Sequence, residues 1–243
     1  MTVLVLKKII QEAMSATRRT YPLLFLITFL SLSAGHFLDF LPGNYSGEYL
    51  RESPDGTLSI QNPWLFTLAL ALTLLTSTFV AVLNFIFLAS AHQKTLCTWN
   101  IAWRLLSHVF MRALLTSLIT WTGVVIGLSL FILPGFVIGT FFALALPIVI
   151  FEESSPWEAL KKSAQRVYPN LLLVALIVCL SWSLLFGGLF LTQVCEEFFN
   201  LGNLSAEFLE ILEGALILPF AQSLIISLYF SLQKGQISSP KTP

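Results

Sequence analysis

Charged side chains are scarce in this chain. Asp, Glu, Lys and Arg make up 11% of its 243 residues, whereas an ordinary soluble domain carries about 25%. So few charges cannot cover a water-facing surface, which excludes a soluble enzyme and a disordered chain. The 13 basic and 13 acidic residues cancel to a net charge of zero, and this excludes a basic nucleic-acid-binding protein.

Residues that bind metals or form disulfides are also few. The three histidines, His36, His92 and His108, are too dispersed along the sequence for a zinc cluster. The three cysteines fall at different depths of the predicted membrane segments, so no intrachain disulfide is expected. The sequence has no Walker loop, no dinucleotide-binding glycine fingerprint, no GxSxG elbow and no HExxH motif. We therefore expect neither a cofactor nor an enzymatic activity.

Apolar residues are abundant instead. The chain is 56% hydrophobic, with a mean hydropathy of +0.82, as expected for a polytopic membrane protein. A helix needs about 20 mostly apolar residues to cross a bilayer. We predict an all-α protein in which residues 1–243 form a single transmembrane domain with six spans. The predicted spans are residues 21–41, 64–91, 114–133, 136–151, 171–194 and 208–232.

The third and fourth spans are the two legs of one apolar stretch, residues 114–151, interrupted by Pro134 and Gly135. Once a two-residue turn is set aside, about 18 residues remain for each leg, which is near the lower limit for crossing. Length therefore favours two full spans joined by a tight turn. The alternative is a re-entrant hairpin, which would also begin and end on one side. Further along, Pro147 is expected to bend its helix.

Basic residues indicate the orientation. If six spans alternate in direction, the segments 1–20, 92–112, 152–170 and 233–243 share one side of the membrane. They hold 12 of the 13 Lys and Arg residues, and only Arg51 lies on the other side. Because positively charged segments stay in the cytoplasm, we predict that both termini are cytoplasmic.

Residues 155–166 have the pattern of a short helix lying on the membrane surface. Ser155 can cap this helix, Pro156 suits its first position, and Glu158 would complete a capping box. An unstructured basic linker is the alternative. The apolar face is expected to hold Trp157, Leu160, Ala164 and Val167. The residues assigned to this interfacial helix are Trp157, Leu160, Lys161, Lys162 and Arg166.

Similar basic amphipathic stretches precede the first and third spans. This arrangement suggests a threefold repeat over residues 1–91, 92–151 and 152–243, in which each unit is a surface helix followed by an out-and-back pair of spans. The clearest sequence match between the units is a Tyr-Pro dipeptide at the beginning of the first and fifth spans. Repeats in membrane proteins often bracket a transport pathway, but duplication with only the packing retained gives the same pattern.

Ionisable residues at membrane depth are costly and point to functional sites. His36 and Asp39 lie near the outer end of the first span, where they could pair, bind a cation or relay protons. The simpler alternative, which we favour, is that both lie among the outer headgroups. Glu207, Glu210 and Glu213 follow one another at three-residue spacing where the last span begins. They could form an external mouth that attracts cations, or simply a solvated acidic face.

Small and amide residues inside the spans indicate how helices pack. Asn84, Gln193 and Gln222 are expected to form hydrogen bonds between helices rather than contact a substrate. Two small-xxx-small patterns occupy the two legs around the Pro-Gly turn, and they would let the legs approach closely. The residues assigned to this hairpin packing are Gly123, Gly127, Pro134, Gly135 and Gly139.

Three motifs follow one another in the middle of the chain: LPG at 133–135, LPIVIFE at 146–152 and SPWEALKKS at 155–163. In this order they resemble the YciC-type bacterial inner-membrane family and the membrane domain attached to some glycerophosphodiester phosphodiesterases. The motif resemblance covers about residues 123–180, and Glu153 stands where a glycine is common in that pattern. The resemblance implies a six-helix protein of the bacterial inner membrane with a role in envelope or lipid maintenance. It carries over no catalytic residue.

Two functions follow from these features. The first is a non-enzymatic envelope protein whose basic surface helices are attracted to anionic lipid, by about 1 kcal/mol for each Lys or Arg near the surface. The second is a small transporter or channel with an acidic outer mouth. The expected partners are membrane lipids, and a homo-oligomer or another membrane protein is a further hypothesis. No nucleic-acid partner is expected.

Overall fold

A computed structural model describes residues 2–37, 50–52, 58–60, 63–95, 97–199 and 203–238. These residues are almost entirely helical, as predicted. The exceptions are two short antiparallel strands, β1 (Leu50–Glu52) and β2 (Leu58–Ile60). The helices are α1 (Thr2–Phe37), α2 (Pro63–Gln93), α3 (Trp99–Leu130), α4 (Ile132–Phe142), α5 (Ala145–Glu152), α6 (Pro156–Val167), α7 (Leu171–Phe199) and α8 (Asn203–Ser238), with a 3-10 turn at Tyr168–Asn170.

Five segments of the described residues are long and apolar enough to cross a membrane. They are Ala71–Gln93, Trp99–Leu130, Ile132–Glu152, Pro156–Phe199 and Phe208–Gln233. Their number and apolar composition fit a multi-pass membrane protein. The predicted first span, residues 21–41, begins within α1 and extends beyond the described residues, and α1 is not among the five segments. The first predicted span therefore stays a prediction.

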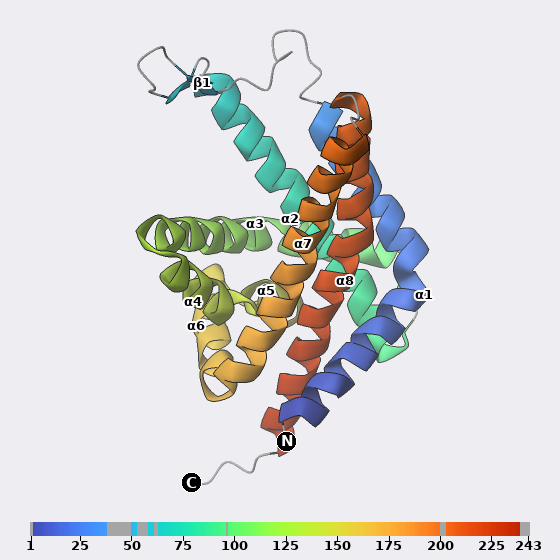
Figure 1. Cartoon of the computed structure of the whole chain (residues 1–243). Coiled ribbons are helices and arrows are strands. Elements are labelled where there is room, and N and C mark those ends of the chain that lie inside the picture. Colours follow the sequence, from blue (N-terminus) through green and yellow to red (C-terminus); the bar gives the residue numbers. More distant parts are fainter. Residues whose placement is uncertain are drawn as a thin grey trace.

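Helices α1, α7 and α8 run roughly along one direction (Figure 1). Helix α7 ends and α8 begins at the upper end of this view, whereas α1 begins and α8 ends at the lower end. A hydrogen bond joins the two outermost elements of the sequence, because the Tyr21 hydroxyl of α1 donates to the Leu216 carbonyl of α8 at 3.3 Å. This bond lies near the middle of both helices, which run antiparallel, an arrangement compatible with termini on one side of a membrane.

Helix α3 runs across α7 and α8 rather than alongside them (Figure 1). It is one continuous helix from Trp99 to Leu130, so the amphipathic stretch predicted at 95–112 and the third predicted span are not separate elements. No proline interrupts this segment, and helix-forming residues fill the expected boundary around residue 113. In contrast, Pro169 lies in the 3-10 turn that divides α6 from α7. The predicted units therefore differ in construction, and the threefold repeat stays a prediction.

Two breaks shape the segment between α3 and α6. The chain turns at Phe131, which is extended with φ −164° and ψ 155°, and not at Pro134-Gly135 as predicted. Pro134 instead lies in the first turn of α4, where its missing N–H would have no helical partner anyway. The second break, at Ala143 and Leu144, separates α4 from α5. In a continuous helix, the backbone carbonyl four residues before Pro147 would find no N–H partner and would clash with the proline ring. This proline therefore accounts for the break.

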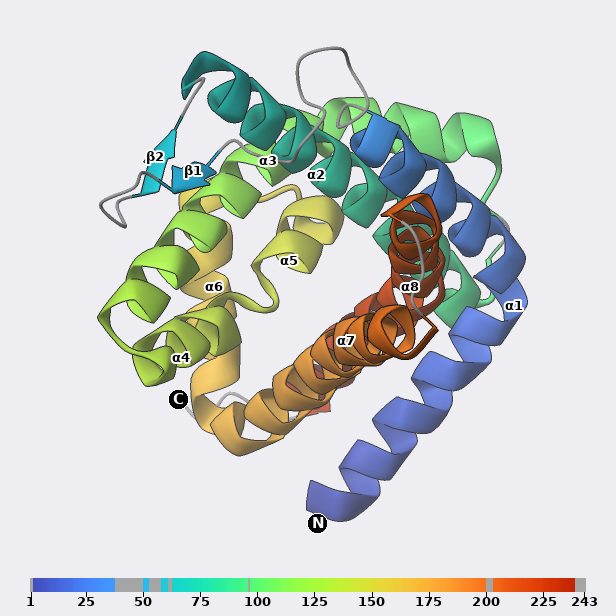
Figure 2. The same cartoon turned by 45° about the horizontal axis from the view of Figure 1, so that its top comes forward.

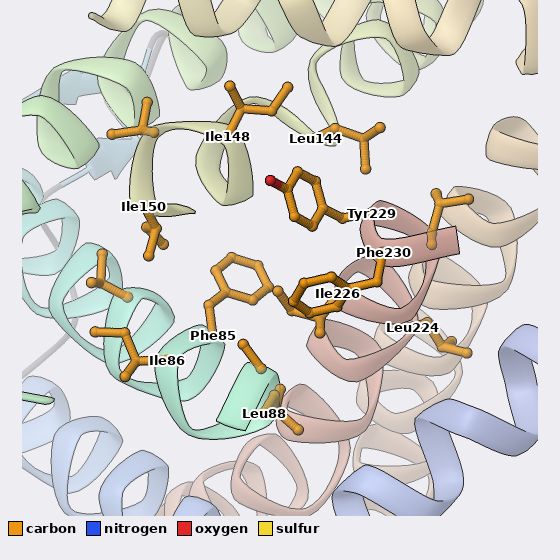
Figure 3. Packing of buried hydrophobic residues seen from close by; sticks show 14 of the residues in the cluster. Phe85, Ile86, Leu88, Leu144, Ile148, Ile150, Leu224, Ile226, Tyr229 and Phe230 are labelled. Carbon is orange, nitrogen blue, oxygen red and sulfur yellow. The ribbon is translucent and has the colours of Figure 1, made fainter. Parts of the chain in front are cut away.

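Part of the hydrophobic core lies where α2, α5 and α8 meet (Figure 3). Tyr229 of α8 points toward Leu144 and Ile148 at the start of α5, and Phe85 of α2 lies beside Phe230. All five side chains are buried. Because this core fixes the short helix α5 against α8, it also fixes where α6 begins.

Candidate functional site

A charge cluster joins the ends of α5, α6 and α8, and we name Glu152, Lys162, Arg166 and Tyr229 the Glu152 cluster. Arg166 Nη1 donates to Glu152 Oε1, and the Tyr229 hydroxyl donates to the same oxygen at 3.0 Å. Lys162 Nζ lies 3.4 Å from Glu152 Oε2. The Arg166 guanidinium also lies 5.8 Å from the centre of the Tyr229 ring, within the range of a cation–π contact.

The backbone between α5 and α6 brings these groups together. Glu153 takes a left-handed conformation, with φ 51°, and ends α5. Helix α6 then starts at the capping box predicted from the sequence, which is confirmed. The Ser155 hydroxyl accepts from the Glu158 N–H at 3.4 Å, and the Glu158 carboxylate accepts from the Ser155 N–H at 3.3 Å. One helix turn apart, Lys162 and Arg166 consequently both face Glu152.

The faces of α6 differ from the prediction. Its buried residues are Ala159, Leu160, Ser163 and Val167. Leu160 and Val167 therefore pack on the protein, whereas Trp157 is 74% exposed and lies on a different face from them. Two of the basic residues assigned to the surface, Lys162 and Arg166, turn inward to Glu152. The sequence pattern correctly predicted an amphipathic helix, but other parts of the protein cover the face that holds Leu160 and Val167.

The outward side of α6 and the start of the 3-10 turn after it carry three exposed residues, Trp157, Lys161 and Tyr168, which we name the α6 stripe. Trp157 and Tyr168 are 74% and 77% exposed, and Lys161 is exposed between them. Their spacings of four and seven residues place them on one side of a helix. Figure 1 shows α6 near the end of the molecule where α1 begins and α8 ends.

The acidic residues predicted to form an outer mouth are described only in part. Glu213 is half-buried between α7 and α8, and its Oε2 accepts a hydrogen bond from Thr192 Oγ1 at 3.4 Å. It packs so closely on Gly188 that a side chain there would overlap its carboxylate. Glu210 is half-buried one turn away. The side chains of His36 and Glu207 lie outside the described part of the structure, as does all of Asp39.

The glycines assigned to hairpin packing do not contribute equally. A Cβ atom added to Gly127 would lie 2.7 Å from the Cα of Gly135, so α3 and α4 are in backbone contact at this point. A Cβ on Gly123 or Gly139 would make only ordinary contacts, the nearest at 3.4 Å and 3.6 Å. The close approach therefore belongs to Gly127 and Gly135, near the turn, and Pro134 lies in the first turn of the returning leg.

A buried amide connects three helices in the interior. Asn84 of α2 is fully buried and donates through Nδ2 to Thr28 Oγ1 of α1 at 3.1 Å and to Gln222 Oε1 of α8 at 2.7 Å. The predicted interhelical role of Asn84 and Gln222 is confirmed. Gln193 is exposed on α7.

Sequence reasoning missed the Glu152 cluster. Its ion-pairing partners come from within the resemblance motifs and just after them, but Tyr229 lies 77 residues beyond Glu152. No short-range spacing pattern in the sequence could predict that Glu152 and Tyr229 form a hydrogen bond. The available signal was a tyrosine inside an apolar span, because a buried hydroxyl needs a hydrogen-bond partner.

Comparisons with known protein families, curated proteins and solved structures found no match for this chain. The class is therefore defined by the fold: a helical protein with several segments able to span a membrane.

Proposed function

We propose that this chain is a non-enzymatic inner-membrane protein that acts in envelope or lipid maintenance by holding α6 against anionic lipid on the cytoplasmic face. The observation that carries this proposal is the α6 stripe, in which a lysine lies between two exposed aromatic residues. Tryptophan and tyrosine favour the headgroup level of a bilayer, and lysine is attracted to anionic headgroups. The resemblance to the YciC-type family agrees with this role and stays a prediction.

The Glu152 cluster supports the same proposal. The short connection between α5 and α6 would by itself leave α6 free to rotate about its own axis. The ion pairs of Lys162 and Arg166 with Glu152 prevent this rotation. Four buried residues of α6 hold the opposite face on the protein. The stripe is thereby directed outward before lipid binds, which lowers the entropy cost of binding.

Lipid binding by the stripe can be measured directly. The purified protein is placed in nanodiscs with increasing phosphatidylglycerol in phosphatidylcholine, and binding is read from the fluorescence of a probe near α6. We expect Lys161→Gln to weaken the preference for phosphatidylglycerol about fivefold, because one lysine near an anionic surface contributes about 1 kcal/mol.

Gln165→Ala is the matched control, since Gln165 is exposed on the same helix but uncharged. It should leave the lipid preference unchanged. Equal preference for phosphatidylglycerol in the parent protein, in Lys161→Gln and in Gln165→Ala would refute the proposal.

A second candidate function, a small transporter or channel, is favoured by the position of Glu213. This carboxylate lies between two membrane-spanning helices and is bonded to Thr192, rather than standing free on a solvated face. A half-buried carboxylate at such a place can attract a cation into a helix interface. Glu210, one turn nearer the outer end, would form the mouth.

Flux measurements distinguish the two candidates. Under the transporter proposal, proteoliposomes should show cation flux that Glu213→Gln abolishes and that Glu197→Gln, at an exposed position of α7, leaves intact. No flux above protein-free vesicles would remove the transporter proposal and leave the lipid-contact role.

A further inference from the structure

A groove of about 450 Å³ lies between α1 and the end of α2. One wall consists of α1 residues between 19 and 23, and the other consists of residues between 87 and 97, from α2 and the connection to α3. Contacts with α2 hold α1 before and after its part of the wall. Glu12 lies 4.0 Å from His92, and Thr28 Oγ1 accepts from Asn84 at 3.1 Å. The groove is therefore bounded by two helices in fixed positions.

Two cations from different elements line this groove. Arg19 belongs to α1, and Lys94 directly follows α2. None of the described residues in the lining carries a carboxylate. Neither cation forms an ion pair or a side-chain hydrogen bond with another described residue. Two unpaired positive charges beside one space repel each other, and an anion between them relieves this repulsion. The groove therefore favours a negatively charged group.

The hydroxyls of the lining already have partners. Thr20 donates to the Ala16 carbonyl at 3.1 Å, Ser90 donates to the Phe87 carbonyl at 2.7 Å, and Thr95 donates to the Ser90 carbonyl at 3.4 Å. Each hydroxyl hydrogen is thus used within the protein. The two charged side chains are what the groove offers to a ligand.

Lys94 occupies a backbone position that favours glycine. Its φ is 56°, and among the described residues other than glycine it shares a positive φ only with Glu153. The Lys94 N–H donates to the Ala91 carbonyl at 3.3 Å, and the Thr95 N–H donates to the Ser90 carbonyl at 2.9 Å. These two bonds end α2 in the usual way for a helix, and glycine would form them without strain. A strained residue that its turn does not require points to a use of its side chain.

An apolar stripe continues from the groove along α1. Leu23, Leu26 and Leu30 are 38%, 51% and 59% exposed, and we name them the α1 leucine stripe. Spacings of four, three and four residues place them on the same side of the helix as Arg19. Leu23 itself lines the groove. The stripe is about 10 Å long, from the rise of a helix per residue. A cationic groove that leads into an apolar stripe matches a phosphate that is followed by an acyl chain.

We propose that this groove binds an anionic phospholipid of the cytoplasmic leaflet, with its phosphate between Arg19 and Lys94 and one acyl chain along the α1 leucine stripe. In the predicted orientation, the segments that hold both cations lie on the cytoplasmic side. Helices α1 and α6 lie on opposite sides of the molecule (Figure 2). The groove is therefore separate from the α6 stripe, and either proposal can fail without the other.

Occupancy of the groove can be followed at Cys97, a free cysteine in its lining. Cys179 and Cys195 are replaced by serine, and the rate at which N-ethylmaleimide labels Cys97 is measured in nanodiscs. We expect phosphatidylglycerol in phosphatidylcholine to slow this labelling in a saturable way, because the bound headgroup covers the thiol. Soluble glycerol phosphate, added to nanodiscs of phosphatidylcholine alone, should not protect the thiol, since it has no acyl chain to pack on the α1 leucine stripe. Protection by the soluble compound would overturn the assignment to a lipid.

A charge-matched pair of variants locates the phosphate. Arg19→Gln should raise the phosphatidylglycerol content needed for half-protection about fivefold, the loss expected for one cation beside an anionic lipid. Arg18→Gln removes the same charge from an adjacent exposed position outside the lining, and at physiological salt it should change this content by less than about twofold. Lys161→Gln, on the α6 stripe, should leave the protection of Cys97 unchanged.

Lys94→Gly separates binding from stability. It should raise the midpoint of thermal unfolding, because glycine is unstrained at this φ, and should still weaken the protection of Cys97 about fivefold. Lys94→Arg keeps the charge and should keep the protection. Unchanged protection in both Arg19→Gln and Lys94→Gly, or equal losses in Arg19→Gln and Arg18→Gln, would overturn the proposal.

Discussion

Glu152 links α5 to both α6 and α8. Its carboxylate receives hydrogen bonds from Arg166 and Tyr229 and lies beside Lys162. The carboxylate of the neighbouring Glu153 pairs distantly with His108, at 3.6 Å, and both of those side chains are exposed, whereas the Glu153 backbone carbonyl accepts a hydrogen bond from Arg112 Nη1 at 2.8 Å. Two adjacent glutamates therefore contribute differently, because one closes a cluster between three helices and the other faces solvent.

Neutralising Glu152 should loosen α6. In Glu152→Gln, Arg166 stays mostly buried without its counter-ion, so we expect the free energy of unfolding to fall by about 1–3 kcal/mol. Glu153→Gln is the matched control and should change it by less than about 0.5 kcal/mol. Chemical denaturation in detergent micelles measures both. Equal stability of the two variants would show that the Glu152 cluster does not hold α6.

Residue-level features were predictable where their partners are close in sequence. The capping box follows from Ser155 and Glu158, three positions apart, and the structure forms it. The partner of Glu152 on α8 could not be predicted, because packing of α5 on α8 brings Tyr229 there. Which side of α6 faces the protein was also beyond the sequence pattern, since apolar residues lie on more than one face.

At the scale of elements, the α3–α4 hairpin depends on two glycines. Gly127→Ala would place a Cβ 2.7 Å from the backbone of Gly135, and the overpacking cost of about 1–3 kcal/mol exceeds the gain in helix propensity of about 1 kcal/mol. We expect a lower unfolding midpoint. A Cβ on Gly123 meets only Cγ2 of Ile138, at 3.4 Å, which is an ordinary van der Waals distance, so Gly123→Ala should be neutral or stabilising.

Thermal unfolding of both variants, followed by circular dichroism, decides the matter. If Gly127→Ala were as stable as Gly123→Ala, the legs of the hairpin would not be in backbone contact, and the close approach in the structure would be wrong.

Helix type and approximate extent followed from the apolar runs, but breaks and directions did not. Pro147 was expected to bend its helix, and the break before α5 agrees. The turn was predicted at Pro134-Gly135, yet proline is tolerated in a first helical turn and the chain reverses at Phe131. The crosswise course of α3 has no local signal, because it results from packing between helices distant in sequence.

At the scale of the whole molecule, charged side chains and neutral polar side chains lie in different regions. Helix α6, which carries the α6 stripe, lies toward the end where α1 begins and α8 ends (Figure 1), whereas Glu213 lies in the N-terminal part of α8 and contacts α7. Between them, the described interior carries neutral amides and hydroxyls, including Asn84 and Gln222. The placement of 12 of the 13 Lys and Arg residues on one side of a membrane stays a prediction.

The most direct test of a membrane-spanning chain with α6 in the cytoplasm is the labelling of single cysteines. The natural Cys97, Cys179 and Cys195 are first replaced by serine, and Trp157→Cys and Glu197→Cys are made separately at exposed positions. In right-side-out vesicles, an impermeant maleimide should label Glu197→Cys at once and Trp157→Cys only after the membrane is opened. Labelling of both variants from the same side of intact vesicles would contradict the proposed arrangement.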